Sequence, residues 1–163
     1  MKAALPMNRF HTRLASLSDL AEICAIEDTA FTEPYPRSLL EQLVRECSQS
    51  FFVATNDAEQ ILGYCVCTIS GRSAHLISIA VDSNLRRKGL GTTLLRRAIE
   101  SLTAIGVHEL WLEVKTDNLE AIGLYRNFGF KTEGLLKAYY SDGSDALRMN
   151  LILRPPNRTR KVR

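Results

Sequence analysis

The sequence lacks long apolar runs and contains little cysteine. None of its 163 residues belongs to a stretch approaching the ~20 apolar residues of a membrane helix, and residues 1–6 lack the apolar segment of a signal peptide. No second Cys or His pair stands at zinc-ligand spacing from Cys65 and Cys67, and the other cysteines are Cys24 and Cys47. We therefore expect reduced, mostly buried thiols, no metal site, and a soluble cytoplasmic protein.

Basic charge is concentrated at the C-terminal end of the chain. Residues 154–163 carry five of the 21 Lys and Arg and no acid, so residues 1–153 hold 16 basic against 18 acidic residues. The hydrophobic fraction of 45% is enough for one core, which predicts a single domain over 1–153. For 154–163 the prolines and like charges predict a disordered tail, with nucleic-acid contact as the alternative.

Hydrophobic periodicity predicts the order β-α-α-β-β-β-α-β-α-β-β. Ser18 is expected to cap the first helix, and Pro36 suits the start of the second. The order predicts an α/β (α+β) fold with a mixed sheet and helices on both faces. The predicted strands span residues 10–15, 50–55, 61–69, 75–81, 108–115, 130–140 and 147–153, and the helices 19–30, 37–46, 90–105 and 118–128.

A charged glycine turn lies between the predicted strand 75–81 and the helix 90–105. Its sequence is Arg86-Arg87-Lys88-Gly89-Leu90-Gly91. The first turn of a helix offers unpaired N–H groups and a positive dipole end, and glycines let the backbone approach an anion. The spacing is neither a Walker loop nor a dinucleotide fingerprint. The turn therefore indicates a pyrophosphate site, with a plain charged loop as the alternative.

This turn and the strand before it resemble the acetyl-coenzyme A motif of the GNAT superfamily of N-acetyltransferases. The likeness spans about residues 9 to 153 and looks like the protein N-terminal acetyltransferases, among them the RimI-like ribosomal-protein alanine acetyltransferases. Its matches are Ile79–Asp82, Arg86–Gly91, Leu110–Val114, Asn118, Ala121, Ile122, Leu124, Tyr125, Phe128–Phe130, Tyr139–Gly143, Asp145, Ala146 and Met149.

The resemblance implies a GNAT fold, a splayed mixed sheet with the cofactor between two parallel strands. Acetyl-coenzyme A is the implied co-substrate, and its pantetheine arm can pair with a strand through backbone hydrogen bonds. A buried core strand is the other interpretation of 79–81, and the two are compatible because those contacts use the backbone. The implied cofactor-binding residues are Ile79, Ala80, Val81, Arg87, Lys88, Gly89, Leu90, Gly91, Thr92 and Asn118.

Two residues are candidates for acid–base chemistry. In the predicted strand 108–115, Glu113 shares a face with Trp111, opposite Leu110, Leu112 and Val114. A carboxylate there needs water or a partner, so a cleft and a structural salt bridge are both possible. RimI-like enzymes have their catalytic base at the matching position. Periodicity makes Tyr125 a core tyrosine, whereas the resemblance makes it the acid that protonates the leaving thiolate.

The resemblance also implies contacts with an acceptor. Glu33 and Tyr35 match the substrate loop of N-terminal acetyltransferases, and Tyr139 and Tyr140 flank a hairpin turn that would cover a peptide N-terminus. Ordinary strand packing is the alternative for the two hairpin tyrosines. His75 matches a histidine of the archaeal-type enzymes that assists deprotonation, a position at which RimI has no histidine; a surface histidine is the alternative.

We therefore expect an enzyme that acetylates the N-terminal α-amino group of a protein, such as a ribosomal protein. The alternatives are acetylation of a small-molecule amine and a non-catalytic module that binds coenzyme A.

Overall fold

A computed structural model describes residues 9–154, whose elements follow the predicted order with two short 3-10 helices added. Beyond Arg154, the predicted basic tail lies outside the described residues, as do residues 1–6. In the described part, no helix combines the length and hydropathy needed to cross a membrane. The elements are β1 (His11–Leu14), η1 (Leu17–Asp19), α1 (Leu20–Ala30), α2 (Arg37–Glu46), β2 (Phe51–Thr55), β3 (Ile61–Ser70), β4 (Ser73–Val81), η2 (Ser83–Leu85), α3 (Leu90–Ala104), β5 (Glu109–Lys115), α4 (Leu119–Asn127), β6 (Lys131–Leu136) and β7 (Ala146–Ile152).

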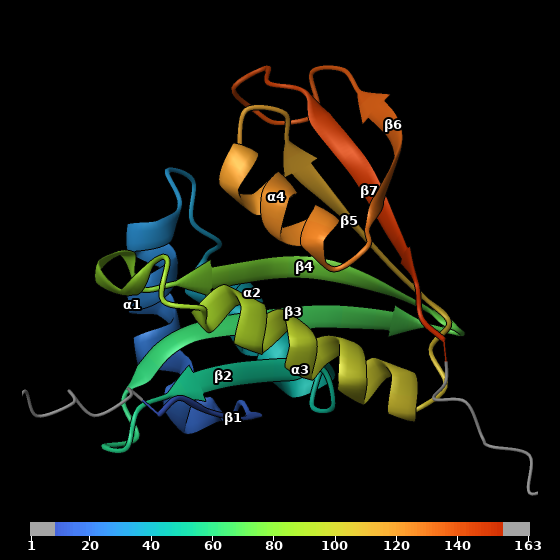
Figure 1. The fold of residues 1–163 in the computed structure, drawn as a ribbon. Helices are drawn as coiled ribbons and strands as arrows, with labels where there is room; N and C mark the ends of the chain where they lie inside the picture. The colour runs from blue at the N-terminus through green and yellow to red at the C-terminus, as the bar shows by residue number, and fades with distance from the viewer. Residues whose placement is uncertain (1–8, 155–163) are drawn as a thin grey trace, which may run out of the picture. The chain divides into compact units, whose positions relative to one another are not determined.

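The strands pair in the order β1-β2-β3-β4-β5-β7-β6, which makes the predicted mixed sheet (Figure 1). The pairs β1–β2, β2–β3, β5–β7 and β6–β7 are antiparallel, whereas β4 and β5 are parallel.

The chain forms two compact units. The first unit runs to Cys67 and includes Ile77–Ala98; the second unit comprises Thr68–Leu76 and the chain from Ile99 onward.

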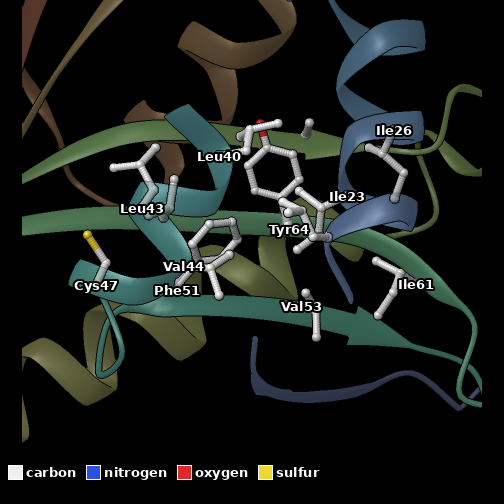
Figure 2. Close-up of a cluster of buried hydrophobic side chains, with 13 residues drawn as sticks. Ile23, Ile26, Leu40, Leu43, Val44, Cys47, Phe51, Val53, Ile61 and Tyr64 are labelled. Carbon is white, nitrogen blue, oxygen red and sulfur yellow. The ribbon is translucent and has the colours of Figure 1, made fainter. Parts of the chain in front are cut away.

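The core of the first unit follows from alternation along β2. Phe51 and Val53 point into a cluster with side chains of α1 and α2 (Figure 2). Phe52 is equally buried but lies on the other face, with the Arg97 guanidinium of α3 5.5 Å from its ring centroid. Alternate residues of β2 thus pack against helices on opposite faces of the sheet. The first unit therefore confirms the prediction of helices on both faces.

Gly63 lies where β3, β4 and α3 approach closely. A Cβ at this position would be 2.8 Å from the carbonyl oxygen of Ala80, 3.2 Å from Leu94 Cδ1 and 3.4 Å from Val81 Cα. Real Cβ atoms do not lie as close as 2.8 Å to another heavy atom, and the Ala80 oxygen belongs to the backbone, so it cannot easily move aside. Glycine at this position therefore allows the Ala80 carbonyl of β4 to lie this close to β3, with Leu94 of α3 packed beside it.

Two local predictions were wrong. Helix α1 begins at Leu20 rather than after Ser18, because the short helix η1 precedes it and Ser16 is the N-cap of η1. The Asp19 carboxylate closes that capping box: it accepts the Ser16 N–H at 2.8 Å and binds Arg13 at 2.7 and 2.9 Å. The Ser18 hydroxyl instead lies 2.7 Å from that of Ser16.

Strand β6 is also shorter than predicted. It ends at Leu136, and Ala138 adopts φ 49°, a left-handed conformation that interrupts a strand. The N–H of Ala138 donates to Asp145 Oδ1 at 2.8 Å. Tyr139 and Tyr140 therefore follow the strand instead of packing within it.

Candidate active site

Glu113 lies on the less buried face of β5. The strand alternates as predicted, with Leu110, Leu112 and Val114 buried and the intervening residues half-buried. The Glu113 side chain is 13% exposed, so its carboxylate needs a partner that replaces lost water.

His75 supplies that partner. Its Nε2 lies 2.6 Å from Glu113 Oε2. The parallel pairing places His75 beside Trp111, and the two rings stack with centroids 3.7 Å apart and planes 4° apart. A carboxylate can only accept, so Nε2 of a neutral His75 carries the proton and Nδ1 is left as an acceptor. Two residues predicted separately thus form one pair capable of moving protons.

Tyr139 belongs to the same group. Burial raises the pKa of Tyr139, and the negative charge of Glu113 and a hydrogen bond to that carboxylate raise it further. The Tyr139 and Tyr140 rings meet edge to face at 5.0 Å, and Lys115 Nζ lies 5.1 Å from the Tyr140 ring centroid. The structure therefore brings both hairpin tyrosines to the face of β5 that carries Glu113.

Sequence reasoning missed Arg148 and gave Trp111 no role. Arg148 is the register partner of Glu113 on β7; its guanidinium carbon lies 4.2 Å from the Trp111 ring centroid and its Nε 3.5 Å from Glu133 Oε2. Trp111 could have been found, because it shares a face with Glu113. Arg148 could not, because it meets β5 through a pairing of distant segments.

Helix α4 carries the two other predicted residues of the second unit. Tyr125 is 6% exposed, and its ring centroid lies 5.6 Å from that of Phe130. Asn118 caps the helix, its Oδ1 accepting the Ala121 N–H at 3.2 Å. The Nδ2 end of Asn118 is therefore the group that a ligand carbonyl would use.

The glycine turn lies in the first unit and leads into α3. Arg87 has φ 62° and Gly89 φ 84°, and the side chains of Arg86, Arg87 and Lys88 are exposed. Thr93 bonds the Gly89 carbonyl through its N–H at 3.0 Å and its hydroxyl at 2.9 Å, so the helical ladder begins there. The preceding first-turn N–H groups, of Leu90, Gly91 and Thr92, have no helical acceptor and can bind an anion.

The remaining predicted residues also lie in the first unit. Along β4, Ala80 is buried and Ile79 and Val81 are half-buried. Glu33 and Tyr35 lie exposed between α1 and α2, and the Tyr35 N–H donates to Glu27 Oε1 at 2.9 Å. Across residues 9–154, no group of three or more His, Cys, Asp or Glu side chains could hold a metal ion.

Comparison with known proteins identifies the family of this chain. Residues 20–130 match the Acetyltransferase (GNAT) family. The chain belongs to the GNAT family. It is 35% identical over 153 residues to an N-alpha-acetyltransferase of Sulfolobus acidocaldarius, covering 86% of this chain and 90% of that protein. As a GNAT enzyme it is an acetyl-coenzyme A-dependent N-acetyltransferase.

Solved GNAT structures share the fold. The ribosomal-protein-S18-alanine N-acetyltransferase of Escherichia coli superposes with a TM-score of 0.82 at 28% identity, covering 93% of this chain and 98% of that one. Ard1 from Thermoplasma volcanium gives a TM-score of 0.84 at 34% identity, covering 89% and 98%. The predicted GNAT fold is confirmed.

The turn of this GNAT domain gives a first testable expectation. Gly89→Asp should weaken coenzyme A binding about tenfold, because it adds a negative charge at the start of α3 and strains a φ of 84°. Calorimetric titration with coenzyme A measures the effect. Gly71→Asp is the matched control: Gly71 has φ 61° and, like Gly89, nothing within 4 Å of an added Cβ, but lies in another turn. Equal affinities for wild type and Gly89→Asp would refute the assignment of the turn.

Proposed function

We propose that this enzyme acetylates the N-terminal α-amino group of proteins. The observation that carries the proposal is the His75–Glu113 pair, whose Nε2 and Oε2 atoms lie 2.6 Å apart. Similarity to an N-alpha-acetyltransferase and to a ribosomal-protein alanine N-acetyltransferase supports the same acceptor class.

The chemistry of the acceptor favours an α-amino group. A free α-amino group has a pKa of ~8, against about 10.4 for lysine, so at pH 7 roughly 10% of the first is neutral but only about 0.04% of the second. Only the neutral amine attacks. A base of modest strength, acting directly or through one water, is therefore sufficient for an N-terminal acceptor.

We assign roles as follows. Acetyl-coenzyme A supplies an activated acyl group as its thioester. Glu113, with His75, takes the proton that the amine loses, and Tyr125 donates a proton to the departing thiolate. The backbone N–H of Val81 is the candidate donor to the oxyanion.

The rest of the predicted residues bind the two substrates. Residues 87–92 hold the pyrophosphate, the backbone of 79–81 pairs with pantetheine, and Asn118 Nδ2 bonds a pantetheine carbonyl. Glu33, Tyr35, Tyr139 and Tyr140 contact the acceptor, for which a ribosomal protein in the cytoplasm is one candidate.

A peptide library tests the proposal. The enzyme is incubated with acetyl-coenzyme A and short peptides that vary in their first residues, and products are read by mass spectrometry. We expect acetylation at the α-amino group of a subset of peptides. The controls are the same peptides with a blocked N-terminus and an internal lysine, and a polyamine. Acetylation confined to the lysine peptides or the polyamine would overturn the proposal.

A further inference from the structure

Glu27 is a buried carboxylate that the roles above do not use. It lies on α1, in the first unit, and is 1% exposed. Acidic side chains are almost never buried so fully without partners, because losing water is costly. Each of its oxygens has one: Oε1 accepts the Tyr35 N–H at 2.9 Å, and Oε2 accepts the hydroxyl of Tyr64.

The bond to Tyr35 anchors the segment between α1 and α2. Tyr35 stands between Pro34 and Pro36, which have no N–H, so its amide is the one backbone donor of this tripeptide. The proline that follows also restricts Tyr35 to extended conformations. The one N–H of this stiff tripeptide is therefore bonded to a buried carboxylate oxygen of α1.

The second oxygen ties the same carboxylate to the sheet. The Tyr64 hydroxyl donates to Glu27 and lies 3.0 Å from Ser78 Oγ on β4. The Tyr64 ring is fully buried in the core cluster, near Leu40 and Ile23 (Figure 2). Burial, and next the charge of Glu27, raises the pKa of Tyr64, so its hydroxyl stays a donor. Ser78 directly precedes 79–81, the segment assigned to pantetheine.

An apolar residue of similar size would fill the space of Glu27 without the cost of burying a charge. What such a residue could not do is accept two hydrogen bonds from different segments. We propose that Glu27 is a positioning residue for the acceptor: its carboxylate fixes the segment 33–36 against β3 and β4. This proposal rests on the proposed function, since it takes Glu33 and Tyr35 as acceptor contacts.

Steady-state kinetics of Glu27→Met tests the proposal. The variant keeps the side-chain volume but removes both acceptors, so the KM for the acceptor peptide should rise about tenfold, the scale of one lost hydrogen bond. The KM for acetyl-coenzyme A should change less than about twofold. Glu27→Gln is the matched control, because its amide oxygen can still accept the Tyr35 N–H, and it should recover most of the loss. An unchanged acceptor KM in Glu27→Met, or equal changes in both KM values, would overturn the role.

A second pair of variants isolates the Tyr35 amide. Tyr35→Pro removes the tyrosine side chain and the backbone N–H, whereas Tyr35→Ala removes the side chain but keeps the N–H. We expect the acceptor KM of Tyr35→Pro to exceed that of Tyr35→Ala about tenfold, and equal values would refute the anchor. This pair leaves Glu27 in place, so it decides the question even if Glu27→Met does not fold.

Hydrogen exchange separates failure of this inference from failure of the proposed function. Peptides covering 31–36 should exchange slowly in the wild type and in Glu27→Gln, and faster in Glu27→Met. This readout needs no acceptor. Fast exchange of residues 31–36 in the wild type would refute the positioning role of Glu27. If the enzyme acetylates no peptide N-terminus but still shows the exchange difference between the variants, only the proposed function is refuted.

Discussion

We expect Glu113→Gln to lower turnover by about one to three decades and to leave the affinity for coenzyme A nearly unchanged. Glutamine has the shape of glutamate and can still accept from His75 Nε2, 2.6 Å away, but it cannot take a proton from the amine. Single-turnover acetylation of a peptide measures the change, and calorimetry with coenzyme A checks the affinity.

Glu133→Gln is the matched control for this variant. Glu133 is an exposed carboxylate of the same unit that pairs with Arg148 rather than His75, so its substitution should leave turnover within about twofold. A Glu113→Gln enzyme with wild-type turnover would refute the role of base. In Glu113→Gln the pKa of Tyr139 should also fall, because one of its upward causes is removed while burial remains. Tyrosinate absorbance during a pH titration reports that change.

We expect Tyr125→Phe also to lower turnover by about one to three decades, with the fold intact. The side chain is 6% exposed and packs on Phe130, so phenylalanine keeps the packing and removes the hydroxyl. If that hydroxyl protonates the leaving thiolate, an acetyl thioester of a more acidic thiol should recover part of the loss. Turnover with the two thioesters measures this recovery.

Two outcomes would contradict the role of Tyr125. Equal losses with both thioesters would mean that the hydroxyl does not act on the leaving group. A fall in melting temperature that accounts for the lost activity would make Tyr125 a core tyrosine, the interpretation that helical periodicity favours. Phe130→Leu is the matched control, because it disturbs the same packing without touching the hydroxyl.

The sequence predicted the parts of the fold that depend on local periodicity. Helix α2 has the predicted bounds because Pro36 and a stripe of leucines define it. The two faces of β5 were predicted because alternation at Glu113 places it opposite Leu112. The family resemblance supplied the candidates Tyr125 and Asn118. Without it, Tyr125 would be interpreted as a core residue and Asn118 as a helix cap.

What the sequence could not predict depends on contacts between distant segments. Glu27 reads as an ordinary surface charge on a helix, and its burial requires Tyr64, 37 residues further along the chain. Strand β6 stops early because Asp145 binds the Ala138 N–H, although Tyr139 and Tyr140 favour extended structure. Arg148 meets Glu113 only through the register of β7 on β5.

Gly63 also affects the spacing between the two elements that are proposed to bind the cofactor. Gly63 lets Leu94 of α3 and the end of β4, at Ala80 and Val81, converge on one point of β3. Under the proposed roles, the amides at the start of α3 bind the diphosphate, and the last residues of β4 pair with pantetheine. A bulkier residue at 63 would press on Ala80 and Leu94, and under the proposed roles we expect it to move the start of α3 away from the strand that pairs with pantetheine.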